Sequence, residues 1–275
     1  MESRNISVRD VEIGNDLPLV LIAGPCQLET RDHALFMAKN IYGACESTNT
    51  KIIFKASYDK ANRSSITKER GVGIDEGLRI LESVRDEFGC PILTDVHNES
   101  QCVAVGEVVD IIQIPAFLCR QTDLLLAAGS TGKVVNVKKG QFMAPWDMVN
   151  VISKIEASGN NQIMLCERGT SFGYNTLVSD FRSIPIMAEN GVPIVFDATH
   201  SVQQPGGRGT SSGGQREFVP PLAQAACAIG VAAVFIETHE APDTAPSDGP
   251  NMLNVRSLQV LVEKLSKLDA VAKEL

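Results

Sequence analysis

The chain has 275 residues, of which 44% are hydrophobic and only 5% aromatic, and its formal net charge is −8. This length is close to the ~250 residues of one (β/α)8 barrel, and the apolar content excludes a disordered chain. The acidic balance offers no broad basic surface, so we expect neither nucleic acid nor a membrane as a partner.

The first predicted element is a β-hairpin. Residues 6–13 alternate roughly between apolar and polar side chains, and Gly14-Asn15-Asp16 then supplies a turn. We expect this hairpin to cover the bottom of the fold that follows it.

Eight short apolar runs come next, and each of them leads to a polar or reactive side chain. A strand that turns polar at its end, repeated eight times with helix-sized gaps, predicts a single-domain (β/α)8 TIM barrel over residues 1–275, with its chemistry at the C-terminal rim. In chain order, run 19–25 leads to Cys26, run 52–54 to Lys55, run 91–94 to Asp95, run 111–112 to Gln113, run 134–137 to Lys138, run 163–167 to Arg168, run 194–199 to His200 and run 234–236 to Glu237.

Helices are predicted in the gaps, at residues 30–46, 74–88, 99–107, 121–128, 145–157, 177–189, 218–229 and 255–273. Two connections are too irregular for helices, because residues 201–217 carry five glycines and residues 238–254 carry three prolines. Both follow strands, so we expect them to lie over the barrel mouth as lids that exclude water. Tolerated surface insertions are the alternative interpretation.

The cysteines and the N-terminus indicate in which cellular compartment the protein is expected. There are seven cysteines, an odd number without a Cys-x-x-Cys pair, which indicates neither a disulfide framework nor a zinc ribbon. The N-terminus is polar, and the longest apolar stretch, residues 225–236, is shorter than the ~20 residues that span a bilayer. We expect a cytoplasmic protein with reduced thiols.

Five cationic residues fall at or just after three predicted strand ends. Converging charges of one sign repel each other unless an anionic ligand neutralises them. Phosphorylated, carboxylated small molecules are therefore the expected ligands, because Arg and Lys bind such groups well. Solvated surface charges are the alternative, and Lys55 could instead be the Schiff-base nucleophile of a barrel aldolase. The five residues are Lys55, Lys60, Arg63, Lys138 and Arg168.

A second set of residues predicts a metal site. Cys26, His200 and Glu237 follow strands that are neighbours where a barrel closes, and Asp248 lies in the loop after the last of them. One thiolate, one imidazole and two carboxylates suit Zn²⁺, Fe²⁺ or Mn²⁺. A buried structural cysteine and a structural histidine are the alternatives. His33, in the first predicted helix, is expected on the surface.

Ten segments in chain order carry a resemblance to a known family: Ala23-Gly24-Pro25-Cys26, Phe54-Lys55-Ala56-Ser57, Lys60-Ala61-Asn62-Arg63-Ser64-Ser65, Thr94-Asp95-Val96-His97, Gln113-Ile114-Pro115-Ala116-Phe117-Leu118, Val137-Lys138-Lys139-Gly140-Gln141, Cys166-Glu167-Arg168-Gly169, Phe196-Asp197-Ala198-Thr199-His200-Ser201, Glu237-Thr238-His239 and Asp248-Gly249-Pro250. On these segments the chain resembles the 3-deoxy-D-manno-octulosonate 8-phosphate synthase family over nearly its whole length. Within that family, a cysteine at position 26 in place of asparagine is similar to the metal-dependent members.

The resemblance implies condensation of phosphoenolpyruvate with D-arabinose 5-phosphate and water, by a cytoplasmic homotetramer with a divalent metal ion, for lipopolysaccharide synthesis. A related family joins phosphoenolpyruvate to erythrose 4-phosphate, but it typically carries Lys-Pro-Arg-Thr at the segment that begins with Lys60. That activity, the Schiff-base aldolase and a catalytically silent binding scaffold stay open as alternatives.

The resemblance also implies roles for individual residues. Lys138 and Arg168 would hold the phosphate of phosphoenolpyruvate. Lys55, Ser57 and Lys60 would hold its carboxylate, with Gln113 nearby. Asn62, Arg63 and Ser64 would bind arabinose 5-phosphate, and Arg120 would reach the sugar phosphate of a neighbouring subunit. Asp95 would lie near the sugar hydroxyls or the attacking water. The catalytic set is Lys55, Asp95, His200 and Cys26, and the metal ligands are Cys26, His200, Glu237 and Asp248.

Overall fold

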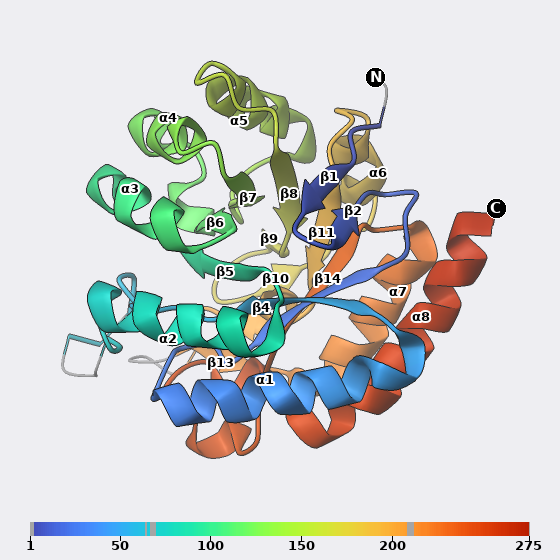
Figure 1. The fold of residues 1–275 in the computed structure, drawn as a ribbon. Coiled ribbons are helices and arrows are strands. Elements are labelled where there is room, and N and C mark those ends of the chain that lie inside the picture. Colours follow the sequence, from blue (N-terminus) through green and yellow to red (C-terminus); the bar gives the residue numbers. More distant parts are fainter. Residues whose placement is uncertain (1–2, 64, 67–69, 208–211, 275) are drawn as a thin grey trace.

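The computed structural model describes residues 3–63, 65–66, 70–207 and 212–274. Eight parallel strands close into a barrel that helices surround (Figure 1). The strands pair in chain order, and the last one pairs with both the first and the seventh, which closes the ring. The predicted (β/α)8 fold is therefore confirmed. The strands are β3 (Val20–Gly24), β4 (Lys51–Lys55), β5 (Ile92–Asp95), β6 (Ile111–Ile114), β7 (Val134–Lys138), β8 (Ile163–Glu167), β11 (Ile194–Asp197) and β14 (Ala233–His239).

Each of the eight barrel strands is followed by a helix in the described chain. Thr30 caps the first of these helices, because its side chain accepts a hydrogen bond from the backbone N–H of His33. A helix with the length and apolar content needed to cross a membrane is not found among the described residues. The helices are α1 (Arg31–Cys45), α2 (Ile74–Phe88), α3 (Glu99–Val108), α4 (Thr122–Ser130), α5 (Met148–Glu156), α6 (Ser183–Ala188), α7 (Val219–Ile229) and α8 (Leu258–Glu274).

The predicted helix over residues 177–189 is wrong in its first half. Strand β10 (Leu177–Val178) pairs antiparallel with β9 (Thr170–Ser171), and only the later residues form α6. The turn between these strands contains Gly173 and Asn175, whose φ angles are 77° and 54°. Glycine and asparagine tolerate this left-handed conformation. The apolar spacing alone does not distinguish the short strand from a helical turn.

The N-terminal hairpin is confirmed, but its turn lies earlier than predicted. β1 (Ile6–Val8) and β2 (Val11–Ile13) pair around Arg9, which has a φ of 55°. The Gly14-Asn15-Asp16 segment comes after the hairpin, and Asn15 ties it to the barrel by accepting a hydrogen bond of 2.8 Å from the N–H of Ile194. The apolar side chains of the hairpin pack against residues at the strand starts, which closes the bottom of the barrel.

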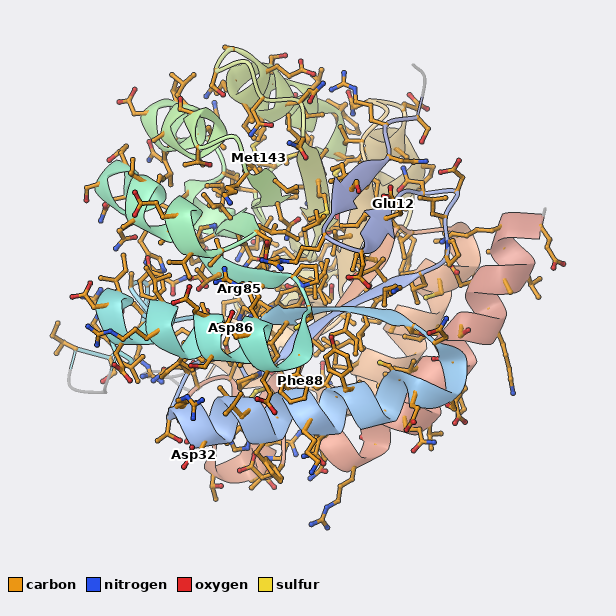
Figure 2. All side chains as sticks on the ribbon, in the orientation of Figure 1. Glu12, Asp32, Arg85, Asp86, Phe88 and Met143 are labelled. Carbon is orange, nitrogen blue, oxygen red and sulfur yellow. The ribbon has the colours of Figure 1, made fainter. Side chains whose placement is uncertain are left out.

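The apolar core lies on both sides of the barrel wall. One set of strand side chains fills the barrel interior, and the other packs beneath the helices. On the outside, α1 and α2 lie side by side, and Phe88 at the end of α2 faces α1 (Figure 2). There the Phe88 ring stacks on Tyr42 with 5.2 Å between ring centroids. The apolar residues inside the barrel are mainly aliphatic, with Phe235 among them.

The two long connections lie after β11 and β14, as predicted. The first contains the short antiparallel strands β12 (Gln203–Gln204) and β13 (Gly213–Gly214). The second contains two short 3-10 turns, and β15 (Leu253–Asn254) then pairs with the end of β14. The described parts of both connections therefore lie at the C-terminal end of the barrel, opposite the hairpin, and residues 208–211 of the first fall outside the described residues.

Candidate active site

The polar strand ends converge on a cavity of about 620 Å³ at the mouth of the barrel. Both long connections contribute to its wall, through residues such as Gln203 and Pro246. Their predicted position over the mouth is thus confirmed. The predicted site residues that line the cavity are Lys55, Ser57, Lys60, Asn62, Arg63, Asp95, Gln113, Lys138, Arg168, His200, Glu237 and Asp248.

Two predicted site residues, Cys26 and Arg120, are not among the described residues that line the cavity. Cys26 is buried, and its Sγ lies 3.4 Å from Oδ2 of Asp248 at the cavity edge. Arg120 is exposed before α4 and is not among the cavity-lining residues, and its carbonyl accepts a hydrogen bond from Lys154. Its role toward a neighbouring subunit stays a prediction. Ser64 falls outside the described residues.

Arg168 lines the cavity and has hydrogen-bond donors that no described residue uses. Arg168 is 4% exposed, and its Nη2 donates a hydrogen bond to Oε1 of Gln203 at 3.0 Å. The Nε and Nη1 atoms are buried without a hydrogen-bond partner among the described residues. A buried guanidinium with free donors is costly unless an anion accepts from it. This wall of the cavity is therefore suited to bind a phosphate or carboxylate group.

Lys138 lies beside Arg168 and is held by a buried aspartate. Its Nζ donates to Oδ2 of Asp197 at 2.5 Å and lies 3.9 Å from the centroid of the Phe235 ring. The same Oδ2 lies 2.7 Å from Nδ1 of His200. Although burial opposes its ionisation, His200 and Lys138 hold the pKa of Asp197 well below its usual range. Asp197 therefore orients two cavity residues at once.

A hydrogen-bonded chain runs along the opposite wall. Nζ of Lys60 donates to Oγ of Ser57 at 2.9 Å, and that hydroxyl donates to Oδ1 of Asp95 at 2.5 Å. Oδ2 of Asp95 lies 2.8 Å from Nε2 of His97. Burial opposes the charge of Asp95, but His97 and Lys60 keep its pKa well below the usual value. Asp95 is thus an ionised acceptor at the cavity wall.

Lys55 lies deep in the mouth between the two walls. It is 2% exposed, and Nζ donates to Oε1 of Glu237 at 2.7 Å and to the carbonyl of Cys26 at 3.2 Å. A buried ammonium is stable only when paired in this way. The pair leaves the second oxygen of Glu237 buried and without a hydrogen-bond partner among the described residues.

Three of the four predicted metal ligands form one close group, and His200 lies next to two of them. Nε2 of His200 is 3.6 Å from Oδ2 of Asp248 and 3.8 Å from Oε2 of Glu237. Ligand atoms of Cys26, Glu237 and Asp248 lie within 4.8 Å of one another. Asp248 has a φ of 51°, a strained backbone that tends to persist at functional sites.

The donor set fits a divalent transition-metal ion. The Glu237 oxygen without a partner faces the group, and the bond from Nδ1 of His200 to Asp197 directs Nε2 toward it. Burial raises the pKa of the Cys26 thiol well above its ordinary value, and Glu237 adds to this effect. A neighbouring cation is what would stabilise the thiolate. Soft and hard ligands of this mixture suit Zn²⁺, Fe²⁺ or Mn²⁺.

Two site residues, Asp197 and His97, were not predicted. The apolar run 194–199 predicts that the seventh strand ends at His200, whereas β11 ends at Asp197. The sequence signal for Asp197 as a site residue is that it is a charged residue within an apolar run. His97 follows Asp95 by two residues, and its contact with that carboxylate depends on a bend that no spacing rule reveals.

A TIM barrel whose mouth gathers cations, carboxylates and a thiol has the architecture of an enzyme that acts on small anionic molecules. The model of the DAHP synthetase I family matches residues 3–274, and the chain belongs to this family.

Relatives with high identity extend over nearly the whole chain, and each is named 2-dehydro-3-deoxyphosphooctonate aldolase. The protein from Brucella anthropi is 59% identical over 277 residues, covering 100% of both chains. The protein from Granulibacter bethesdensis is 58% identical and covers 99% of this chain and 96% of its own. The protein from Bartonella quintana is 57% identical, with coverages of 98% and 97%.

Proposed function

We propose that this protein condenses phosphoenolpyruvate with D-arabinose 5-phosphate and water to give 3-deoxy-D-manno-octulosonate 8-phosphate and inorganic phosphate, for lipopolysaccharide synthesis. The names of relatives 57–59% identical over nearly the full chain support it. The observation that carries it is one cavity with cationic groups on opposite walls, after β4 and after β7 and β8. Such a mouth suits a reactant with an anionic group at each end, and Arg63 nearer the entrance suits a second anionic reactant.

Phosphoenolpyruvate would span the mouth between these walls. Lys138 and Arg168 would hold its phosphate, since the unused donors of Arg168 need an anionic acceptor. Lys55, Ser57 and Lys60 would hold its carboxylate from the other side, with Gln113 nearby. Fixing both ends orients carbon 3 toward the second reactant.

Arabinose 5-phosphate would bind nearer the entrance. Asn62 and Arg63 line the cavity just beyond Lys60, and Ser64 follows them in the chain. Arg63 also donates to the carbonyl of Pro246 in the long connection after β14. The sugar phosphate would therefore meet the loop that covers the mouth. Arg120 of a neighbouring subunit would complete this site in a homotetramer.

The proposed reaction joins carbon 3 of phosphoenolpyruvate to the aldehyde carbon, adds water at carbon 2 and releases phosphate by cleavage of its C–O bond. Lys138 and Arg168 would stabilise the charge on the departing phosphate. Asp95, ionised and held by Ser57 and His97, would orient a sugar hydroxyl or the attacking water. The connections over the mouth would exclude bulk water.

We assign the chain to the metal-dependent type. Cys26, His200, Glu237 and Asp248 would hold the ion, and the buried Glu237 oxygen without a hydrogen-bond partner supports this assignment. When bound, the ion would supply a Lewis acid that polarises the aldehyde or activates water. In the catalytic set, Lys55 would keep Glu237 charged and in place through their ion pair.

Phosphate release tests the proposed substrates. Phosphoenolpyruvate would be paired in turn with arabinose 5-phosphate, erythrose 4-phosphate and N-acetylmannosamine, and we expect rapid release only with arabinose 5-phosphate. Faster release with erythrose 4-phosphate would overturn the sugar assignment. Borohydride treatment with substrate provides a second test, because a Schiff-base aldolase gives a covalent adduct at Lys55. We expect none, since its amine is engaged with Glu237.

We further propose that the subunit is one domain and that the homotetramer works in the cytoplasm. All seven cysteines are buried and free, which supports a reducing compartment. Sedimentation analysis of the purified protein would measure the number of subunits, and a monomer at all concentrations would contradict the assembly.

A further inference from the structure

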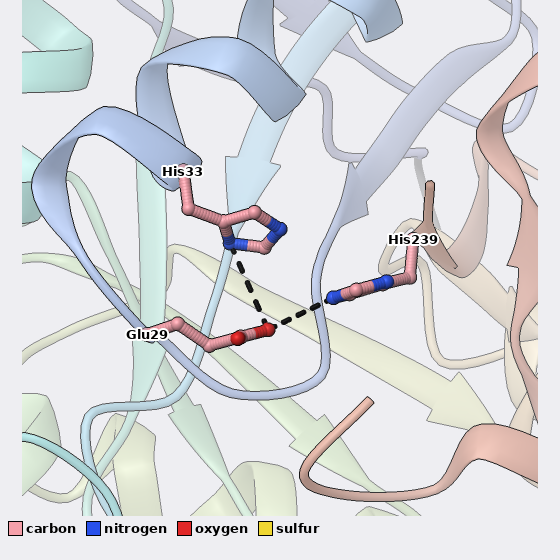
Figure 3. Close-up of side chains that lie close together, drawn as sticks. All are labelled: Glu29, His33 and His239. Carbon is pink, nitrogen blue, oxygen red and sulfur yellow. Dashed lines mark hydrogen bonds and ion pairs between the residues drawn. The ribbon is translucent and has the colours of Figure 1, made fainter. Parts of the chain in front are cut away.

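A second cluster of metal-binding side chains lies outside the mouth cavity (Figure 3). Glu29 comes from the loop before α1, His33 from the first turn of α1 and His239 from the last residue of β14. The expected surface position of His33 is wrong, because its side chain is only 13% exposed and contacts two glutamates. Glu29 and His33 are four residues apart, and the fold brings His239 to them from the other end of the chain.

We propose that Glu29, His33 and His239 bind a divalent transition-metal ion of the Zn²⁺ class, separate from the ion proposed at Cys26. One ligand atom from each lies within 4.8 Å of the other two. Oε1 of Glu29 is 2.8 Å from Nε2 of His239 and 3.8 Å from Nδ1 of His33. Tetrahedral zinc with bonds of about 2.0–2.1 Å separates its ligand atoms by roughly 3.3 Å, which lies between these two distances.

The imidazole of His33 is already arranged as that of a metal ligand. Its Nδ1 is buried without a hydrogen-bond partner among the described residues, and it faces the Glu29 carboxylate. Its Nε2 lies 3.0 Å from Oε2 of Glu240. With the proton on Nε2, donated to Glu240, the lone pair of Nδ1 points at the proposed ion. A carboxylate that holds the second ring nitrogen is the usual outer support of a metal-binding histidine.

His239 has to change its tautomer to take part. Its Nδ1 accepts a hydrogen bond from the N–H of Ala241 at 2.9 Å, so that Nε2 carries the proton and donates to Glu29. When the ion binds Nε2, the proton moves to Nδ1. Oε2 of Glu240 lies 3.3 Å from Nδ1 and can accept a hydrogen bond from it. Binding of the ion thus breaks the hydrogen bonds that His239 forms with Ala241 and Glu29, and it forms a metal–nitrogen bond and a hydrogen bond from Nδ1 to Glu240. Glu240 then supports both imidazoles.

The position of the cluster indicates a structural role. Glu29 follows Cys26 by three residues, and His239 follows Glu237 by two. An ion at the cluster would fasten the loop after β3 to the end of β14, the two segments that carry ligands of the first site. The set contains two imidazoles and carboxylate oxygen but no thiolate. This composition suits Zn²⁺ or Co²⁺ and gives the two sites different spectra.

The experiment removes the first site and measures what remains. Purified wild-type protein, Cys26→Ser and Cys26→Ser/His33→Asn would be stripped with a chelator and dialysed against buffered ZnCl₂. We expect about two, one and no zinc ions per chain at the same free concentration. Loss of His33 should weaken binding on the order of 100-fold or more, because even outer-shell changes cost about 10–100-fold. Glu87→Gln in the Cys26→Ser background is the matched control, since Glu87 is exposed on α2, and it should still bind one ion.

Cobalt provides a second measurement in the same variants. Co²⁺ bound to Cys26→Ser should show d–d absorption without a thiolate charge-transfer band, and His33→Asn should remove that absorption. Circular dichroism would verify that each variant is folded. The second site is overturned if Cys26→Ser binds no ion, or if adding His33→Asn leaves its affinity unchanged. A wild-type protein with one ion that only His33→Asn removes would keep this site and refute the site at Cys26.

Discussion

Replacing Arg168 with methionine should lower activity and raise stability. The guanidinium is buried, and two of its nitrogens have no partner among the described residues. Hydrogen bonds to charged groups contribute about 1.5–3 kcal/mol each. Two such bonds to the phosphate of phosphoenolpyruvate amount to ~3–6 kcal/mol, or about 10²- to 10⁴-fold in kcat/KM. Without substrate, the same donors cost stability, so Arg168→Met should unfold at higher urea concentration, with a gain on the order of 1 kcal/mol.

Two assays check this prediction on the same preparations. Phosphate release gives kcat/KM for phosphoenolpyruvate, and urea unfolding gives the free energy of unfolding. Arg79→Met is the matched control, because the Arg79 side chain is 74% exposed on α2 and should change neither quantity. A variant of Arg168 that loses more than about 1 kcal/mol of stability and keeps its kcat/KM would refute the assignment of Arg168 as an anion-binding residue.

Three further predictions concern the metal, the sugar phosphate and the thiols. Cys26→Ala should abolish metal-stimulated turnover and chelation should lower the wild-type rate reversibly, whereas full activity after exhaustive chelation would contradict the metal site. Arg63→Ala should raise the KM for arabinose 5-phosphate about 10- to 100-fold and that for phosphoenolpyruvate much less; equal effects would argue against its placement. Burial raises the pKa of Cys45 and of Cys227 to about 12, from a usual value of 9.0. Their stabilisation is therefore complete below pH 9 and is lost as the pH rises toward 12, by about 1.4 kcal/mol per thiol between pH 8 and pH 10. Urea unfolding at both pH values should show a smaller loss in Cys45→Ser/Cys227→Ser, and an unchanged loss would contradict this prediction.

The barrel and most of its mouth could be predicted because parallel strands bring their carboxyl ends to one edge. Each strand end is readable as a change from apolar to polar residues, so Lys55, Asp95, Lys138 and Glu237 needed no knowledge of the loops. The predicted ligand set at Cys26 rested on the same geometry, since the first and last strands of a closed barrel are neighbours.

What the sequence did not reveal depends on how the chain turns after a strand. The end of β11 lies at Asp197 and not at His200, so the residue that holds Lys138 is a strand-end residue that the apolar run 194–199 conceals. The hairpin over residues 170–178 has too few residues to show a period of two. The contact between His33 and Glu240 crosses the ends of two elements far apart in the sequence, and no spacing predicts it.

The mass of the product tests most directly whether this barrel joins a three-carbon and a five-carbon reactant. Purified protein would be given phosphoenolpyruvate with equal concentrations of arabinose 5-phosphate and erythrose 4-phosphate, and the products would be resolved by mass spectrometry together with the phosphate released. The eight-carbon 3-deoxy sugar acid phosphate should form in equal amount to the phosphate. A seven-carbon product in excess, or phosphate without any condensed product, would contradict the proposed function.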